Sequence, residues 1–245
     1  MQKYAAAMSG VLLIRCMKLF TTEEIRAIDR ATIEREEVSP LELIERVGEG
    51  VASEIATRWR PNKPTIVFAG PGNNGADALA ASRLLWERGF RPEVYLFNIG
   101  GDKLSGDCAA SRDRLLREVP ELTFCEVQSR FNMPMITSNH LVVDGLFGSG
   151  LREELKGGFK SLVQNINDEH PTVVSIDVPS GMFGDWNPQK VNRNIMHATL
   201  TLAIQFPRIS FFIADNAELI GEWKVLDIGL SEAAIAATPA SFSLV

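Results

Sequence analysis

Three turns rich in Gly, Asn, Asp and Ser follow short apolar segments of the sequence, and their side chains are the ones best suited to chemistry. The polar residues of these turns are Asn73, Asn74, Asp77, Asp144, Asp177 and Ser180. Asp177 lies between the apolar residues Ile176 and Val178. A carboxyl group that is partly withdrawn from water holds its proton more readily, and such a group can serve as both acid and base. We therefore predict a catalytic role for Asp177.

Asn74, Asp144 and Ser180 offer only oxygen ligands of low formal charge. Such ligands suit an alkali or alkaline-earth cation better than zinc or copper. A single Asp at the end of a strand is more often a helix cap or turn former. The prediction of a site therefore depends on all three turns meeting, as the carboxyl ends of parallel strands do.

The first of these turns has glycines at G-x-G-x-x-G spacing, namely Gly70, Gly72 and Gly75. It follows the strand-like segment 65–69 and precedes helix-forming residues at 78–85, which is the arrangement that binds phosphate at a helix N-terminus. A hydride-transfer enzyme would need an acidic residue about twenty positions later, and a P-loop would need Lys-Ser or Lys-Thr. Neither is present, so we expect neither an ordinary dehydrogenase nor an NTPase.

The elements that position these turns alternate along the chain. Capping patterns at Thr21 and at Ser39-Pro40 predict two helices before the first strand. The apolar segments then predict strands at 93–97, 122–127, 141–144, 172–176, 198–204 and 223–228, and helices at 106–118, with Leu115 and Leu116 inward, and 159–166. This alternation predicts an α/β, Rossmann-like, doubly wound and mainly parallel sheet with helices on both faces.

The chain has 245 residues, a formal net charge of −6 and three cysteines without a C-x-x-C pair. These features fit a reducing compartment and argue against a thiolate metal site. Cys108 and Cys125 are interpreted as buried side chains. No basic run or long apolar stretch suggests nucleic acid or a membrane as a partner. We predict a disordered extension at residues 1–16, one domain at 17–232, and a tail or linker at 233–245.

Taken together, the motifs 70–77, 143–150 and 175–181 resemble those of NAD(P)H-hydrate epimerases. The resemblance implies a cytoplasmic enzyme, usually a homodimer, that interconverts the R and S forms of the hydrated cofactors NADHX and NADPHX. A dehydratase, in the same chain or a separate one, then restores the S form. It also implies a potassium ion held by Asn74, Asp144 and Ser180, and a catalytic Asp177. The residues that it implies for substrate binding are Asn73, Asn74, Gly75, Ala76, Asp77, Gly148, Ser149, Gly150, Leu151, Arg152, Glu153, Glu154 and Asp177.

Two departures from the family pattern leave an alternative open. Ala76 and Ala78 stand where the family has glycines, and Ala76 would be strained if its φ were positive. Glu153 stands where the family often has a basic residue, so it would repel a pyrophosphate unless Arg152 compensates. The alternative is a non-catalytic nucleotide-binding or interaction module with the same fold. The chain is expected to be either a stand-alone epimerase or part of a bifunctional protein.

Overall fold

The computed structural model describes residues 17–186 and 194–244. Its centre is a seven-stranded sheet in which every neighbouring pair is parallel, in the order β4-β3-β2-β5-β6-β7-β8. The strands are β2 (Thr65–Ala69), β3 (Pro92–Phe97), β4 (Thr123–Val127), β5 (Leu141–Gly145), β6 (Thr172–Ile176), β7 (Leu200–Ile204) and β8 (Glu222–Leu226). The predicted Rossmann-like α/β fold is confirmed.

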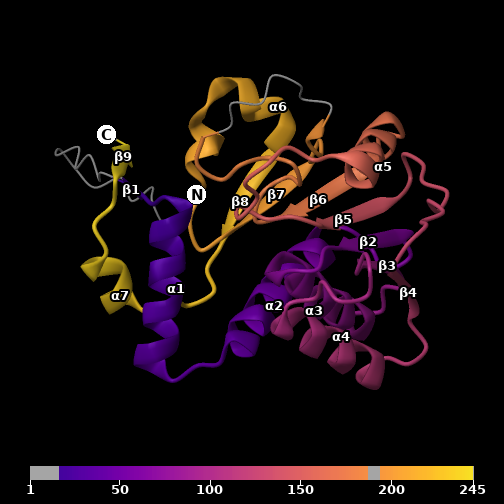
Figure 1. Ribbon diagram of the computed structural model, residues 1–245, viewed down its shortest axis with the longest axis horizontal. Coiled ribbons are helices and arrows are strands. Elements are labelled where there is room, and N and C mark those ends of the chain that lie inside the picture. Colours follow the sequence, from indigo (N-terminus) through magenta and orange to yellow (C-terminus); the bar gives the residue numbers. More distant parts are fainter. Residues whose placement is uncertain (1–16, 187–193, 245) are drawn as a thin grey trace.

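Helices cover both faces of this sheet (Figure 1). One face packs against α2 (Pro40–Arg58), α3 (Asn73–Glu87) and α4 (Gly106–Glu118). The other face packs against α5 (Gly157–Asp168) and, near β7, against α6 (Ala217–Ile220), which follows the 3₁₀ turns η2 (Ile209–Phe212) and η3 (Ala214–Asn216). The central strands β2 and β5 are buried along their whole length, since both faces are covered.

Chain direction across the sheet reverses between β2 and β5. From β2 the chain proceeds through β3 to β4 at one edge, returns to place β5 beside β2, and then continues through β6 and β7 to β8. In doubly wound sheets, ligands bind at such a reversal, beyond the carboxyl ends of the strands. The first two of the predicted polar turns follow β2 and β5, and therefore flank this point.

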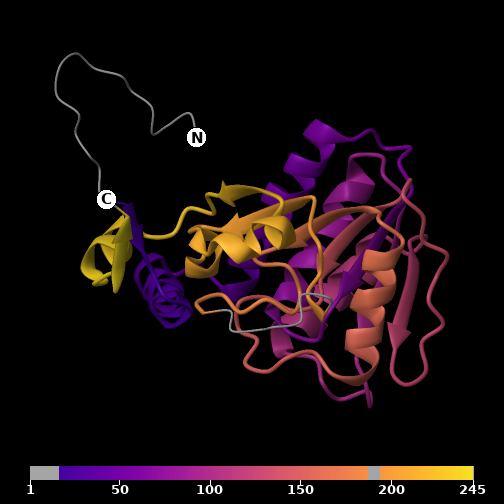
Figure 2. The same ribbon diagram turned by 90° about the horizontal axis from the view of Figure 1, so that it is seen from above.

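The N-terminal helix α1 (Thr22–Glu36) lies at one end of the molecule beside α7 (Glu232–Ala237) (Figure 2). The segment predicted as a tail or linker, 233–245, contains most of α7 and the strand β9 (Phe242–Leu244), which pairs antiparallel with β1 (Met17–Leu19). This pairing joins the two ends of the described chain. The predicted disorder of residues 1–16 lies outside the described residues.

The sequence predicted the helix starts well. Thr21 accepts a hydrogen bond from the backbone N–H of Glu24, and the Glu24 side chain accepts one from Thr21, which completes a capping box. Ser39 and Glu42 form the same motif at α2, with Pro40 in the first turn. These local hydrogen bonds depend only on residues three positions apart, so a sequence pattern predicts them reliably.

Two predictions of burial were wrong. Leu116 is exposed while Leu115 is buried, because adjacent residues of α4 point about 100° apart and only one can face the core. Cys125 is exposed because β4 is an edge strand of the sheet, whereas Cys108 is buried as predicted. Within the described residues, no helix is long and apolar enough to cross a membrane.

Candidate functional site

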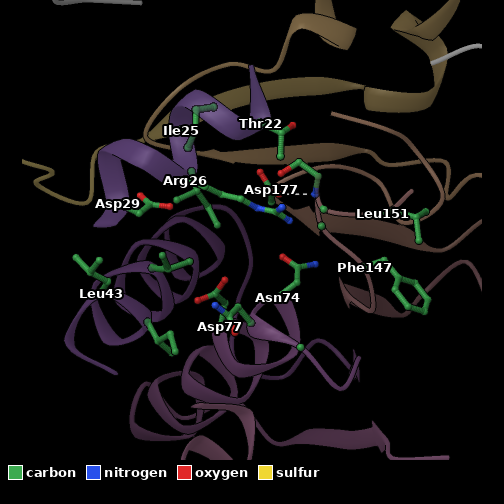
Figure 3. Close-up of a pocket in the computed structure, with 18 of the residues that line it drawn as sticks. Thr22, Ile25, Arg26, Asp29, Leu43, Asn74, Asp77, Phe147, Leu151 and Asp177 are labelled. Atoms are coloured by element: carbon green, nitrogen blue, oxygen red, sulfur yellow. Dashed lines mark hydrogen bonds between the residues drawn. The ribbon is translucent and has the colours of Figure 1, made fainter. Parts of the chain in front are cut away.

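The three polar turns meet around one cavity of about 770 Å³. From the first turn come Gly72, Asn73, Asn74 and Asp77, and from the second come residues 146–152. Asp177 of the third turn lines the same cavity. Figure 3 shows Asn74 and Asp77 approaching from α3, and Asp177 from the opposite side of the cavity. The volume is in the range that binds cofactor-sized ligands.

Asp177 comes directly after β6 and has a left-handed backbone conformation, with φ of 69°. One carboxylate oxygen, Oδ1, accepts a hydrogen bond of 2.7 Å from Nε of Arg208 and lies 2.5 Å from Nη2 of the same guanidinium in an ion pair. The other oxygen, Oδ2, accepts a hydrogen bond of 2.7 Å from the backbone N–H of Ser149. Positive φ is strained for a residue with a side chain, and such strain collects at functional sites. The carboxylate is therefore held in one orientation from both sides.

Gly148 makes the approach of the second and third turns possible. A Cβ atom at this position would lie 2.7 Å from Asp177 Oδ2 and 3.3 Å from Asn74 Oδ1. The side chains of Asp177 and Asn74 therefore both pack against the bare Cα of Gly148. Any larger residue would separate the two side chains from the loop.

Arg208 is a site residue that the sequence did not reveal. It lies in the loop after β7, is 4% exposed and lines the cavity. Its Nη1 atom is buried and has no hydrogen-bond partner among the described residues. The local sequence Phe-Pro-Arg has no distinguishing pattern, and the approach of Arg208 to Asp177, 31 positions away, depends on the neighbouring positions of β6 and β7 in the sheet.

Two further carboxyl groups, those of Asp77 and Asp29, line the cavity. Burial raises the pKa of Asp77 well above its usual value, and the negative charges of Asp177 and Asp29 add to the effect. Burial raises the pKa of Asp29 to about 6, against the opposing charge of Arg208. Asp77 was predicted from the first turn. Asp29 was not, because α1 showed no feature beyond an ordinary capped helix.

Asp144 and Ser180, predicted as ion ligands, are in direct contact. Ser180 Oγ donates to Asp144 Oδ1 at 2.5 Å and its backbone N–H donates to Oδ2 at 2.8 Å. Ser175 Oγ also donates to Oδ2 at 2.8 Å. The third predicted ligand, Asn74, lies beside them, since its backbone carbonyl packs against Gly145, the residue after Asp144.

One wall of the cavity is apolar and comes from the first two helices. It consists of Ile25 and Ile33 from α1 and Leu43, Ile44 and Val47 from α2. The sequence predicted both helices but gave them no part in the site. Their contribution follows from the packing of α1 and α2 beside the ends of the strands, which no local pattern reveals.

Four of the residues predicted to bind substrate do not line the cavity. Gly75 and Ala76 belong to α3 and are buried on its inner side. Glu153 is exposed and forms an ion pair of 2.8 Å with Lys156, and Glu154 is also exposed. The other predicted substrate-binding residues, Asn73, Asn74, Asp77, Gly148, Ser149, Gly150, Leu151, Arg152 and Asp177, do line it.

The strain expected at Ala76 is absent. Ala76 lies within α3, and its backbone N–H donates the helical hydrogen bond to the carbonyl of Gly72. It is not among the described residues with positive φ. Alanine is a better helix former than glycine at such a position. The departure from the family's glycine therefore suits the helix and leaves the cavity unobstructed.

Known proteins share this chain's sequence and fold. The family model described as YjeF-related protein N-terminus matches residues 40–210. An NAD(P)H-hydrate epimerase of Rhodobacter capsulatus is 34% identical over 175 residues, which cover 69% of this chain and 79% of the relative. A crystal structure of the yeast protein ynu0, YNL200c, superposes with a TM-score of 0.64 at 20% identity, covering 85% of this chain and 87% of the yeast chain.

Other relatives are about twice as long. The bifunctional NAD(P)H-hydrate repair enzyme Nnr of Coxiella burnetii is 30% identical over 214 residues, which cover 87% of this chain and 42% of the relative. The chain thus spans about two fifths of the length of these bifunctional relatives. The family model covers most of this chain, including all three turns of the site. By sequence and by fold, the chain belongs to the family of YjeF-related protein N-terminal domains.

Proposed function

We propose that this chain interconverts the R and S forms of NADHX and NADPHX, as an isomerase in the repair of hydrated nicotinamide cofactors. The observation that carries the proposal is the carboxylate of Asp177, fixed by Arg208 and Ser149 at the wall of a cofactor-sized cavity. Three relatives named NAD(P)H-hydrate epimerase support it, because the matches cover 79%, 84% and 86% of their lengths.

The reaction breaks and re-forms one C–O bond, and the catalysis that it requires is proton transfer to and from the oxygen. In the hydrate, C6 of the nicotinamide ring carries the hydroxyl group and is bonded to the ring nitrogen. When an acid protonates the hydroxyl, the nitrogen lone pair expels it as water and leaves a planar iminium centre. Water then adds to the opposite face and gives up a proton to a base. The reaction consumes no redox equivalent, and the site must supply one proton donor and one proton acceptor.

Asp177 is arranged as the proton acceptor. The Arg208 guanidinium and the Ser149 N–H group each hold one of its carboxylate oxygens in place at the wall of the cavity. Asp77 is arranged as the donor, since burial raises its pKa well above the usual value and so favours its protonated form. The sequence alone suggested one carboxyl in both roles, and the structure supports a division of the roles between two.

A potassium ion fits the residues around Asp144. This carboxylate is fully buried, and no Lys, Arg or His among the described residues lies within ion-pair distance of it. Its hydrogen-bond donors are neutral hydroxyl and backbone groups, and Ser180 Oγ also lies 3.2 Å from the Phe147 carbonyl oxygen. Asn74, Asp144 and Ser180 would hold the ion. Its charge would compensate Asp144 and keep the turns together.

The family resemblance also supports a homodimer in the cytoplasm, with a dehydratase in the same or another chain acting on the S form. The alternative of a non-catalytic module loses its two supporting observations. Ala76 is an ordinary helical residue, and Glu153 is exposed, paired with Lys156 and outside the cavity. Neither residue lines the cavity, so neither gives a reason for lost turnover.

The test is chromatographic separation of R and S hydrates after incubation with the protein, compared with the spontaneous rate. We expect Asp177→Asn to lower the enzymatic rate at least about 100-fold, the scale of acid–base contributions. Asp113→Asn, an exposed change on α4, is the matched control and should have no effect.

Equal rates for the wild type and the spontaneous reaction would refute the proposed activity, and an active Asp177→Asn variant would refute the role of Asp177. The same assay with lithium in place of potassium tests whether the site holds a potassium ion. An unchanged rate would contradict the proposed potassium site. Sedimentation of the full chain tests the dimer.

A further inference from the structure

Arg26 of α1 extends into the cavity toward the second turn, as Figure 3 shows. Its Nη2 atom lies so close to Gly150 that a Cβ atom at that position would collide with the guanidinium group. Gly150 is the residue after Ser149, whose N–H group is bonded to Asp177. The guanidinium group of Arg26 thus reaches from α1 to the loop whose Ser149 N–H group holds the Asp177 carboxylate.

Arg26 makes no hydrogen bond or ion pair with any of the residues that the structure describes, although the cavity contains three carboxyl groups. Arg208, by contrast, is bonded to Asp177. The carboxyl of Asp29 lies one turn along the same helix, yet its Coulombic interaction with Arg26 is weaker than that with Arg208. A cation that lines a cavity without an ion pair to the protein suits an anionic group of the ligand.

The position of Arg26 matches the layout of a dinucleotide. The loop from Ser149 to Arg152 spans at most about 10 Å, since an extended chain advances about 3.3–3.6 Å per residue. Arg152 also lines the cavity and has no ion pair among the described residues. A ligand with its nicotinamide ring at Asp177 would therefore place its diphosphate, one ribose away, beside these two guanidinium groups.

We propose that Arg26 binds the diphosphate of the dinucleotide and that α1 is thereby part of the substrate site. The inference takes the class of ligand, a dinucleotide, from the proposed function, but it does not require that the protein turns this ligand over. Guanidinium groups pair with phosphate oxygens through two parallel hydrogen bonds, which a lysine cannot reproduce. Arg26 accordingly contributes affinity at a point remote from the proton transfers.

The test measures binding of ADP-ribose, which carries the diphosphate but no nicotinamide, by isothermal titration calorimetry. We expect Arg26→Gln to raise the dissociation constant about tenfold or more, the scale of a lost charge-assisted hydrogen bond. Arg26→Lys should recover part of the affinity. Arg30→Gln, an exposed change on the same helix outside the cavity, is the matched control and should bind as the wild type does.

In the epimerase assay, Arg26→Gln should raise KM and leave kcat within about twofold, because the interaction is the same in the ground and transition states. Equal affinity of Arg26→Gln and wild type for ADP-ribose, or no binding by the wild type at millimolar concentration, would overturn the inference. A wild type that binds ADP-ribose through Arg26 but leaves the hydrates unchanged would uphold the inference and refute the proposed function.

Discussion

At the scale of single residues, Asp177 shows how a buried carboxyl group is given partners in this site. Oδ1 accepts a hydrogen bond from Arg208 and also forms an ion pair with it, and Oδ2 accepts a hydrogen bond from the Ser149 N–H group. Withdrawing a carboxylate from water costs several kcal/mol unless a cation and further donors compensate it. Arg208 is therefore a positioning residue for Asp177, and the two side chains act as a unit.

We predict that Arg208→Gln lowers the free energy of unfolding by about 3–5 kcal/mol, the cost of leaving a buried charge unpaired. It should also lower kcat, because the Asp177 carboxylate loses the side chain that fixes its Oδ1 atom. Urea denaturation and epimerase rates measure the two effects.

Arg208→Lys keeps the charge and should restore kcat in part. The matched control is Arg88→Gln, which removes an ion pair with Glu49 that is much more exposed. Such surface pairs contribute at most about 1 kcal/mol. A kcat equal to that of the wild type in Arg208→Gln would contradict the positioning role.

At the scale of elements, α3 begins earlier than its helix-forming residues suggest. The helix starts at Asn73, so Asn73 and Asn74 of the glycine-rich loop belong to the first helical turn of α3. Gly72 precedes the helix without a side-chain cap, which leaves the first N–H groups of α3 free to meet a ligand. Ala76 and Ala78 follow within the helix, where their methyl groups pack into the core.

We predict that Ala76→Gly lowers the free energy of unfolding by about 1 kcal/mol or more, from the poorer helix propensity of glycine and the loss of a buried methyl group. It should leave kcat/KM within about twofold. Ala78→Gly, at a second buried position of the same helix, provides a comparison. A severalfold gain of epimerase activity in Ala76→Gly would instead show that the methyl group limits the site.

At the scale of the whole molecule, the cavity forms only when α1 and α2 lie beside the ends of the strands. The β1–β9 pairing and the packing of α7 on α1 connect this part to the C-terminal segment. The backbone N–H of Ser231 donates to Thr32 of α1, and Ser241 donates to Glu24. In the first turn of α1, the side chain of Asp185 accepts hydrogen bonds from the backbone N–H and the hydroxyl group of Thr22. Segments far apart in the sequence thus hold one wall of the site.

The gathering of carboxyl groups in this cavity has a consequence for stability. The pKa of Asp29 is about 6 in the folded protein, above its ordinary value of 3.8, mainly because of burial. Between these pH values the folded state retains a proton that the unfolded state releases. The contribution of Asp29 to stability is therefore most favourable below pH 4 and falls as pH rises through about 6.

We predict that Asp29→Asn, which stays neutral at all pH values, gains stability relative to the wild type as pH rises from 4.5 to 7.5. Urea denaturation of both proteins at four pH values in this range gives the difference. Charged groups common to the two proteins, including Arg26, Arg30, Arg208 and Asp177, largely cancel in that difference. A difference that does not vary with pH would contradict the prediction.

The sequence by itself determined the local elements and the three turns of the site. Helix caps, apolar strands and turn residues depend on neighbours within a few positions, so patterns of spacing reveal them. The parallel order of strands then brings Asp77 and Asp177 to one cavity. The motif also predicts Gly75 and Ala76 as site residues, because it records only their positions in the sequence. In the structure α3 turns both residues toward the core.

Only the tertiary structure decided the electrostatics and the outer wall of the site. Arg208 and Asp29 reach Asp77 and Asp177 from separate elements, and Arg26 reaches the second turn from α1. Their positions depend on how helices pack on the sheet and on the pairing of the chain's two ends, which are contacts between distant residues. No local pattern encodes such contacts, because each side chain acquires its partner only when the whole chain is folded.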